Sequence, residues 1–495
     1  MTLEEMCVHA LARDASQPAI EYGKRWFSWG EMRRVAERVT GLIEESGADP
    51  RAPIAFMPRT RPSAAAALLG LIAKGRTVRM VYVFQSTAGL IRDIEVRKPA
   101  AVVGAATDFS DELIEGLRER GIAAIALEDM DANAVRGLEK SSAEADLNAP
   151  ARHIETLTSG TTGAPKQFPL SYDMIGEHIV GKNLMFSGKG FAGSQQAPLL
   201  LAAPLGNISG IYGILPTTIR GHRVSLLDRF TVAGWHDYVL RYRPQIANMP
   251  AAGVQMVLDA CIPREDLASI KTISTGAAPL DPTVQRAFEE HYGIAILSAY
   301  GATEFAGPVA AMTPELHAVW GKEKFGSVGK AVHGAQLRTI DPETGEVQSP
   351  GEQGILEVIA PRMGTHWIRT SDIVMIDADG FVFHRGRADG AIVRGGFKLL
   401  PETIERALLL HGAVSAAVVI GVADRRLGQV PVATIQLKPG AEQPTIGALQ
   451  AHLRNHVLST HIPTNWLFVA DLPRTPSMKV DRPAVRRLVE ASLSH

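Results

Sequence analysis

A glycine-rich segment at 157–167, with the sequence LTSGTTGAPKQ, has the residue types of a phosphate-binding loop. Glycines remove side chains so that backbone N–H groups can converge on an anion, while hydroxyl side chains and a lysine add donors and positive charge. In a Walker loop a Ser or Thr directly follows the lysine and binds magnesium, whereas Lys166 follows Pro165 and precedes Gln167. The segment also lacks the G-x-G-x-x-G of a dinucleotide site. By itself the segment therefore fits either a phosphate loop of another class or a glycine-rich turn.

A second segment, 300–307 (YGATEFAG), places an aromatic ring, a threonine and a carboxylate close together. With this segment, the loop resembles the adenylate-forming superfamily, which includes acyl- and aryl-CoA ligases, peptide-synthetase adenylation domains and luciferases. The superfamily signatures TSG-[ST]-TG-x-PK and Y-G-x-T-E stand here at 158–166 and 300–304. The resemblance implies that the loop holds the β- and γ-phosphates of ATP, the part that leaves as pyrophosphate. The loop residues assigned to this role are Thr158, Ser159, Gly160, Thr161, Thr162, Gly163 and Lys166.

The same resemblance assigns roles within the second motif and just before it. The ring of Tyr300, next to Gly301, would stack on adenine. Thr303 would donate to the α-phosphate, and Glu304 would supply a hard oxygen for Mg²⁺. Upstream, 275-TGAAPLD-281 resembles the G-A-x-P-L shelf on which the adenine base lies. The candidates for that shelf are Gly276, Ala277 and Ala278.

Two motifs further along the chain resemble the ribose site and the hinge of the superfamily. Asp372 in 369-RTSDIV-374 matches the aspartate that accepts hydrogen bonds from both ribose hydroxyls, with Ser371 standing where the family has glycine. In 386-GRADGAIVRGGFKLLPETIE-405, Arg387 would reach the ribose or a phosphate and Asp389 would be the pivot. This segment departs from the family pattern at Gly390, Val393 and Thr403, in place of an acidic residue, a frequent Lys and a frequent Glu.

Near the C-terminus, 472-LPRTPSMKVDR-482 matches L-P-R-T-P-S-G-K, with Met478 in place of the family glycine. The resemblance makes Lys479 the lysine that brings carboxylate and α-phosphate together. In the family the C-terminal domain swings about the hinge between two steps, which would remove Lys479 and bring Gly395 and Gly396 to the thiol tunnel. The resemblance covers roughly residues 25 to 487.

These parts fit the activation of a carboxylic acid. Attack by the carboxylate on the α-phosphorus of ATP gives an acyl-AMP and expels pyrophosphate. The transition state spreads negative charge over phosphate oxygens, so the protein has to position the reactants and stabilise charge. The nucleophile is already ionised, so no general base is required. The expected co-substrates are ATP and CoA, with Mg²⁺ as the cofactor.

The acyl pocket is expected around the segment 204-PLGNISGIYG-213. No acidic residue lies between Pro204 and Arg220, which argues against an amino acid as substrate. CoA ligases commonly carry an aromatic-His pair where this chain has Gly206 and Asn207. Small residues suggest room for a ring or a branched, bulky acid, and size alone does not separate an aryl acid from a medium-chain fatty acid. The pocket candidates are Asn207, Gly210, Ala299, Ala306 and Gly307.

Three functions are weighed for the second step. The favoured one is a stand-alone ligase that passes the acyl group to CoA, because the chain carries no carrier domain. Transfer to a separate carrier protein or to an amine is the second. The third is a nucleotide-binding protein with impaired chemistry, motivated by Met478, Gly390 and Asn207.

The elements that must position these residues follow an α/β pattern. Ser28 and Glu31 have the spacing of a capping box at the start of an amphipathic helix, and 63–73 is typical of a buried helix. A β-rich run at 77–84 precedes alternating strands and helices, while the polar stretch 128–152 is expected to be a loop. The expected strands and helices are strands at 99–104, 122–127, 198–204, 222–227, 245–249, 270–275 and 295–300, and a helix at 110–121.

After residue 326, short strands broken by turns predict a small β subdomain. From about 386 a small α+β unit follows, with a helix from Pro401 to Gly412. The predicted fold is therefore α/β, with a large N-terminal domain that contains α/β sheets and the β subdomain. The predicted boundaries are 1–385 for this domain, 386–391 for the hinge and 392–495 for a small mobile C-terminal α+β lid.

Composition narrows the class of protein. A chain of 495 residues is too long for one hydrophobic core, so more than one domain is expected. The 51 Lys plus Arg balance 52 Asp plus Glu, which argues against nucleic acid and anionic membranes as partners. No apolar run is long enough for a membrane span, and Cys7 and Cys261 fit two free thiols in a reducing compartment. We expect a cytoplasmic enzyme that acts on a small carboxylic acid, with a homodimer as a further expectation.

Overall fold

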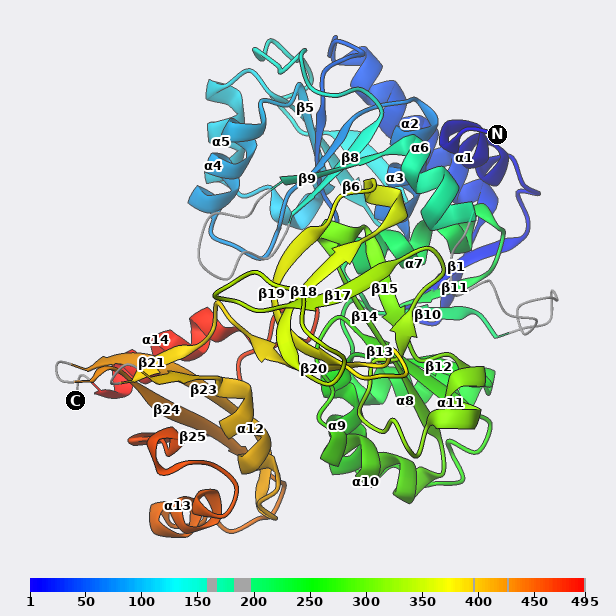
Figure 1. Ribbon diagram of the computed structural model, residues 1–495. Helices are drawn as coiled ribbons and strands as arrows, with labels where there is room; N and C mark the ends of the chain where they lie inside the picture. Colours follow the sequence, from blue (N-terminus) through cyan, green and yellow to red (C-terminus); the bar gives the residue numbers. More distant parts are fainter. Residues whose placement is uncertain (158–166, 182–196, 395–396, 425–426, 494–495) are drawn as a thin grey trace. The chain divides into compact units, whose positions relative to one another are not determined.

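The computed structural model describes residues 1–157, 167–181, 197–394, 397–424 and 427–493. The chain divides into two compact units, one with Met1–Phe230 and Ala302–Gly307 and the other with Thr231–Gly301 and Pro308–His495. Both contain helices packed on sheets (Figure 1), which confirms the expected α/β class with a small C-terminal α+β part. This division into compact units does not fall at 385–391, where the sequence predicts a hinge between two domains. That domain boundary stays a prediction. None of the helices in the described ranges combines the length and apolar character that crossing a bilayer requires.

The first unit is organised around a sheet with the strand order β7-β6-β5-β3-β4-β8-β9. Its inner pairs are parallel, whereas β7 and β9 pair antiparallel at its edges. The strands are β3 (Ile54–Met57), β4 (Val78–Met80), β5 (Ala101–Ala105), β6 (Ala123–Glu128), β7 (Asp131–Ala134), β8 (His153–Leu157) and β9 (Gln167–Ser171).

Two helices of this unit match the expectation from sequence. Helix α2 (Trp29–Glu45) begins at the predicted capping box, where Ser28 and Glu31 each bond the backbone N–H of the other. This reciprocal arrangement satisfies two N–H groups that a helix start otherwise leaves without partners. Helix α3 (Pro62–Ala73) is buried along nearly its whole length, as the run of apolar residues predicts.

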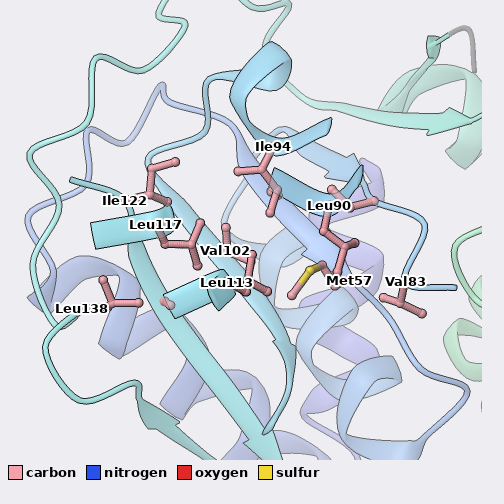
Figure 2. Packing of buried hydrophobic residues seen from close by; sticks show 12 residues of the cluster. Met57, Val83, Leu90, Ile94, Val102, Leu113, Leu117, Ile122 and Leu138 are labelled. Carbon is pink, nitrogen blue, oxygen red and sulfur yellow. The ribbon is translucent and has the colours of Figure 1, made fainter. Parts of the chain in front are cut away.

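The core beside this sheet is formed by α4 (Thr87–Arg97) and α5 (Asp111–Glu119), as Figure 2 shows. Leu113 and Leu117 of α5 point toward Val102 of β5, and each of the three is at most 1% exposed. Replacing such a buried leucine by alanine typically costs about 2–5 kcal/mol of stability, because a cavity is left behind. The helix at 87–97 was not expected from sequence.

Two expectations were wrong in this unit. The β-rich run at 77–84 forms a strand only at Val78–Met80. Val81 and Val83 lie outside this strand, and their apolar character is explained by burial in the core. The polar stretch 128–152 contains β7, which folds back on β6 through a tight turn with Asp129 at φ +46°. Aspartate tolerates this left-handed conformation better than most residues, so the turn forms without glycine.

A smaller sheet of the same unit has the order β10-β11-β1-β2. It joins strands far apart in sequence, since β1 and β10 both pair parallel with β11. Its strands are β1 (Pro18–Tyr22), β2 (Arg25–Ser28), β10 (Leu199–Leu201) and β11 (Val224–Leu226). The remaining helical segments of the unit are α1 (Leu3–Leu11), η1 (Ala106–Asp108), α6 (Tyr172–Met174), η2 (Ile175–Gly181), α7 (Ile208–Ile219) and η5 (Thr303–Phe305).

A sheet with the order β12-β13-β14-β15-β16 begins in the second unit and carries the nucleotide motifs. Strands β12, β13 and β14 are parallel, so the chain leaves all three at one edge of the sheet. The strands are β12 (Ile246–Asn248), β13 (Thr272–Gly276), β14 (Ala295–Ala302), β15 (Gly307–Ala311) and β16 (Lys330–Ala331). The helices in this region are α8 (Val232–Tyr242), α9 (Ala251–Asp259), α10 (Pro282–Tyr292) and α11 (Pro314–Trp320).

The predicted β subdomain is an antiparallel sheet in which β17, β18, β19 and β20 lie side by side in chain order (Figure 1). Its strands are β17 (Gln336–Ile340), β18 (Gln353–Ile359), β19 (Ile368–Ile376) and β20 (Val382–Arg387), with η6 (Pro361–Met363) between β18 and β19. The register pairs Asp372 of β19 directly with Arg387 of β20. Two predicted site residues are thereby brought together by strand pairing.

The C-terminal α+β part has the strand order β22-β21-β24-β23, with β25 parallel to β24. Two helices of this part, α12 (Pro401–Leu409) and α14 (Arg482–Leu493), are linked by side chains. Glu405 of α12 accepts two hydrogen bonds from Arg482 of α14, at 2.9 and 3.2 Å. The expected helix at 401–412 begins at Pro401 as predicted and ends at Leu409, three residues before Gly412. The elements are β21 (Ile392–Arg394), β22 (Phe397–Leu399), α12 (Pro401–Leu409), β23 (Val414–Asp424), β24 (Gly428–Leu437), α13 (Ile446–Arg454), η7 (Ser459–His461), β25 (Asn465–Val469) and α14 (Arg482–Leu493).

Candidate active site

Three strands bring together the side chains predicted for the nucleoside. Tyr300 lies near the end of β14, Asp372 lies on β19, and Arg387 ends β20. We call these residues, with His384 of β20 and Asp389 just after it, the nucleoside cluster. They belong to one compact unit, so their mutual geometry is defined.

The carboxylate of Asp372 is the centre of the nucleoside cluster. Its Oδ2 accepts a hydrogen bond from the hydroxyl of Tyr300 at 2.5 Å, and its Oδ1 lies 3.4 Å from Nε2 of His384. Nη1 of Arg387 lies 3.6 Å from the same Oδ1, close enough for attraction between charges. An ionised carboxylate can only accept hydrogen bonds, so the imidazole nitrogen facing it is assigned as the donor.

These neighbours keep Asp372 ionised although it is only 9% exposed. Burial by itself would raise the pKa of this carboxyl group, because it disfavours the charged form. The hydrogen bonds from His384 and Tyr300, with the charges of His384 and Arg387, outweigh burial and lower the pKa below its ordinary value. A carboxylate that stays charged is the form that accepts hydrogen bonds from sugar hydroxyls.

Arg387 is held by Asp389, which follows it in the chain, and by Ser371 of the neighbouring strand β19. Its guanidinium makes a two-pronged contact with Asp389, from Nε to Oδ1 at 2.9 Å and from Nη2 to Oδ2 at 2.7 Å. That contact is the main reason that the pKa of Arg387 lies above its ordinary value. Nη2 also donates to Oγ of Ser371 at 2.5 Å. Ser371, which departs from the family glycine, therefore adds a hydrogen bond that glycine could not make.

The predicted adenine shelf follows β13. At Gly276 a Cβ atom would lie only 2.9 Å from the carbonyl oxygen of Ala299 on the neighbouring strand, so a side chain there would force the strands apart. Ala277 adopts φ +64°, which is uncommon for a residue other than glycine, and Ala278 follows it. This backbone exposes small residues at the strand edge, which suits a flat base.

Thr303 and Glu304 begin the short helix η5, directly after β14. The residue that caps the end of this helix is Ala306, which is fully buried at φ +51°, and Gly307 follows at φ +129°. The side chain of Glu304 is exposed. Magnesium bound to phosphates keeps several waters and uses only one or two protein carboxylates, so a single exposed glutamate fits this ion. No group of three metal-ligating side chains occurs in the part of the chain that the structure describes.

Asn207 stands at the N-cap of α7 and lines a small pocket in the first unit. The other residues lining this pocket are Pro58, Met80, Val81, Tyr82, Val83, Phe84, Pro204 and Gly206. Gly210 has a packing reason to be small, because a Cβ there would lie 2.1 Å from the carbonyl oxygen of Pro204. Its role as a pocket wall, like that of Ala299, Ala306 and Gly307, stays a prediction.

Lys479 lies in a tight turn that we call the lysine turn (residues 474–480). Arg474 and Val480 form an isolated β-bridge, and the N–H of Thr475 donates to the carbonyl oxygen of Lys479 at 2.7 Å. Met478 adopts φ +64°, the left-handed conformation that favours glycine. The departure from the family glycine therefore keeps the backbone conformation that glycine commonly supplies, with a methionine side chain added.

Other predicted residues lie outside the described ranges. These are the phosphate loop (Thr158, Ser159, Gly160, Thr161, Thr162, Gly163 and Lys166) and the tunnel pair (Gly395 and Gly396). The residue that sequence reasoning missed is His384. It is a single histidine of β20, and its position beside Asp372 follows from the β19–β20 pairing.

Comparison with known proteins agrees with these motifs. A family model described as AMP-binding enzyme matches residues 7–364, and one described as AMP-binding enzyme C-terminal domain matches residues 403–479. The sequence is similar to 4-coumarate–CoA ligase 3 of Oryza sativa subsp. japonica, with 26% identity over 100% of this chain and 93% of that protein. It is also similar to 2-succinylbenzoate–CoA ligase of Geobacillus kaustophilus, with 30% identity over 67% of this chain and 68% of that protein.

Solved structures share the fold. o-Succinylbenzoate CoA synthetase of Bacillus subtilis, in complex with its acyl-adenylate intermediate, matches with a TM-score of 0.77 and 21% identity over 97% of both chains. An anthranilate CoA ligase in complex with anthranoyl-AMP matches with a TM-score of 0.78 and 19% identity over 100% of this chain and 98% of that one. The family models cover most of the chain and the fold is shared almost end to end. The chain therefore belongs to the AMP-binding enzyme family of adenylate-forming proteins.

Proposed function

We propose that the protein is an AMP-forming acid–thiol ligase, which converts a carboxylic acid to its CoA thioester by way of an acyl-AMP. The observation that carries the proposal is the nucleoside cluster. An aromatic ring, an ionised carboxylate and a guanidinium converge there from β14, β19 and β20. The relatives named as CoA ligases support the same reaction.

In the first step, a carboxylate oxygen of the acid forms a bond to the α-phosphorus of ATP. The bond from that phosphorus to the bridging oxygen of the β-phosphate breaks, and pyrophosphate leaves with the electron pair. No proton has to move, because the acid is already ionised. In this proposal Asp372 holds the ribose and Tyr300 the adenine, while Thr303, Lys479 and the phosphate loop with Lys166 stabilise the charge on phosphate oxygens.

Mg²⁺ would be held by Glu304 together with the phosphates. When bound, it neutralises charge on the phosphate oxygens of ATP. The exposed carboxylate of Glu304, just after the strand that carries Tyr300, supports this assignment.

In the second step, the sulfur of CoA forms a bond to the acyl carbon and AMP leaves, while the thiol proton passes to solvent. Gly395 and Gly396 are assigned to the tunnel for the thiol, and Asp389 to the hinge between the two steps. The contact of Asp389 with Arg387 supports a link between the proposed hinge and the nucleoside cluster, because a movement at Asp389 would change the two-pronged contact that holds Arg387.

The acid is proposed to have an apolar aromatic or aliphatic body. The side chains around Asn207 are mainly apolar and aromatic, and the segment that carries Asn207 has no acidic residue that would bind an α-amine. Transfer to an amine or a carrier protein is the second candidate, and impaired chemistry is the third. The conformation of Met478 favours an intact lysine turn over impairment.

A screen of pyrophosphate release tests the proposal, with aromatic and aliphatic acids, with and without CoA. CoA-dependent release of AMP with at least one acid is expected. Release of AMP only with an amine or a carrier protein would select the second candidate. ATP binding without pyrophosphate exchange for any acid would select the third.

We also propose a cytoplasmic location and a homodimeric state. Two free cysteines, Cys7 buried and Cys261 exposed, fit a reducing compartment. Sedimentation of the purified protein tests the homodimer, and fractionation of cells that express it tests the location.

A further inference from the structure

His384 contacts the two side chains that are proposed to hold the nucleoside. Its Nε2 lies 3.4 Å from Oδ1 of Asp372, and its ring centroid lies 6.3 Å from that of Tyr300 with the ring planes tilted by 34°. The imidazole is only 14% exposed, so it is held in this place by its surroundings. The family motifs at the site give it no role.

Tyr300 and His384 each contact a different oxygen of the Asp372 carboxylate. An ionised carboxylate has two oxygens with about four lone-pair sites in all. The hydroxyl of Tyr300 uses one site on Oδ2, and His384 uses one on Oδ1. One site is left on each oxygen, and two adjacent hydroxyl groups on a ribose need one acceptor each. The pair of donors therefore leaves the carboxylate with the capacity and the orientation that a vicinal diol requires.

We propose that His384 is a positioning residue for the nucleotide. It fixes the plane of the Asp372 carboxylate, so that both ribose hydroxyls meet oxygens already oriented toward them. This inference rests on the proposed function, because it takes Asp372 as the ribose acceptor. It goes further because it makes His384, a residue outside the 369–374 motif, contribute to the preference for ribose over deoxyribose.

Removing His384 should act on ribose recognition more than on the rest of the nucleotide. Without His384, Oδ1 keeps only the attraction of Arg387 at 3.6 Å. The carboxylate would then turn more easily about its bond to Cβ and offer one well-oriented oxygen in place of two. A hydrogen bond to a charged group changes affinity by about tenfold or more. AMP should therefore lose about tenfold in affinity, whereas 2′-deoxy-AMP and 3′-deoxy-AMP, which already lack one hydroxyl, should lose less than about threefold.

The test is equilibrium binding of AMP, 2′-deoxy-AMP and 3′-deoxy-AMP to the full chain, which does not require the acid to be known. The variants are His384→Phe, which keeps a ring but removes the donor, and His384→Gln, which keeps a donor. Asp372→Asn reports the acceptor itself. His333→Phe is the matched control, because it makes the same change at an exposed histidine of the same unit. Thermal unfolding of each variant shows that it is folded.

We expect His384→Phe to reduce the preference for AMP over both deoxynucleotides about three- to tenfold, with His384→Gln and His333→Phe close to the wild type. An unchanged preference in His384→Phe would overturn the proposal, as would a Gln variant as weak as the Phe variant. If Asp372→Asn also keeps the preference, the ribose role of Asp372 fails and the proposal fails with it. If the Phe variant does not fold, His384→Asn, whose shorter amide does not reach Oδ1, replaces it with the same expected loss.

Discussion

The nucleoside cluster and the lysine turn carry the two most important groups of the proposed reaction, and they are built differently. In the nucleoside cluster, side chains from three strands hold one another through hydrogen bonds of 2.5–2.9 Å, such as those from Tyr300 to Asp372 and from Arg387 to Asp389. In the lysine turn, backbone bonds close the loop, and Met478 adopts a conformation that disfavours a side chain. The buried hydroxyl of Thr475 finds no hydrogen-bond partner among the described residues.

The difference matches what each region has to do. The nucleoside must be held in the same way while the acid is activated and while the acyl group is transferred, and a network of charged hydrogen bonds fixes such a geometry in advance. In the proposed reaction, the charge of Lys479 is needed in the first step only. The lysine turn that carries Lys479 is closed by backbone hydrogen bonds within a single short segment.

The largest expected effect comes from Lys479→Ala. Loss of one preorganised charge donor typically reduces catalysis by about 10²–10³, so pyrophosphate release should fall by that factor. Acyl transfer from a supplied acyl-AMP to CoA should keep nearly its wild-type rate. Comparing the two half-reactions in one variant separates the lysine turn from the nucleoside cluster, which serves both steps.

Lys438→Ala is the matched control for this prediction. It removes an exposed lysine of the same C-terminal part, and both half-reactions should be unaffected. If Lys479→Ala lowers both half-reactions together, the assignment of the lysine to the first step is wrong, and the contrast between the two regions disappears.

The next effect is that of Tyr300→Phe. This variant keeps the ring and removes the 2.5 Å bond to Oδ2 of Asp372. Leaving a buried charge without that donor should weaken ATP binding about tenfold, measured as KM in pyrophosphate release, with kcat changed less than about threefold. Tyr292→Phe is the control, because the hydroxyl of Tyr292 donates to the backbone oxygen of Ile262 at 3.0 Å and serves only the core. Equal effects of the two variants on KM would contradict a specific role for Tyr300.

A smaller effect concerns the pH at which Asp372 is protonated. Its pKa in the folded protein lies below the ordinary 3.8, so folding favours the ionised form. The resulting stability is present above about pH 4 and is lost as the pH falls through the folded pKa. Tyr300→Phe removes one of the donors that lower this pKa, so the pKa should rise.

The measurement is the carboxyl carbon shift of Asp372 in protein labelled at aspartate, with Asp372→Asn identifying the signal. In the wild type the midpoint of the change in shift should lie below the ordinary aspartate value, and in Tyr300→Phe the midpoint should lie at a higher pH. A wild-type midpoint above the ordinary aspartate value would mean that burial outweighs the donors.

Much of the fold followed from local signals in the sequence. The capping box at Ser28 and the proline at 401 marked two helix starts correctly, because capping and proline geometry depend on neighbouring residues only. The motif residues Tyr300, Asp372 and Arg387 were predicted as one site, and the structure brings them together. Strand β7 and helix α4 were missed, although Ser86 caps the start of α4 by accepting a hydrogen bond from the N–H of Gly89.

The rest of the site depended on information that is not local. His384 reaches Asp372 because a register shift in the β19–β20 pair sets which residues face each other, and one sequence does not encode that register visibly. The hydrogen bond that Ser371 accepts from Arg387 also depends on the pairing of β19 with β20. The left-handed conformation of Met478 was hidden because methionine gives no sign of a turn that glycine would have announced.

The smallest effect is expected at Met478. A left-handed conformation costs a residue with a Cβ atom about 1–2 kcal/mol, whereas glycine adopts it readily but loses more chain entropy on folding. Met478→Gly and Met478→Ala both remove the side chain, and only the alanine keeps the strain. The glycine variant should therefore hold the lysine turn more stably than the alanine variant by about 0.5–1 kcal/mol. Hydrogen exchange at the amides of Thr475 and Met478, which close the turn, measures this difference. Equal exchange in the two variants would show that the backbone of the turn is unstrained, and that the two regions differ only in their side-chain bonds.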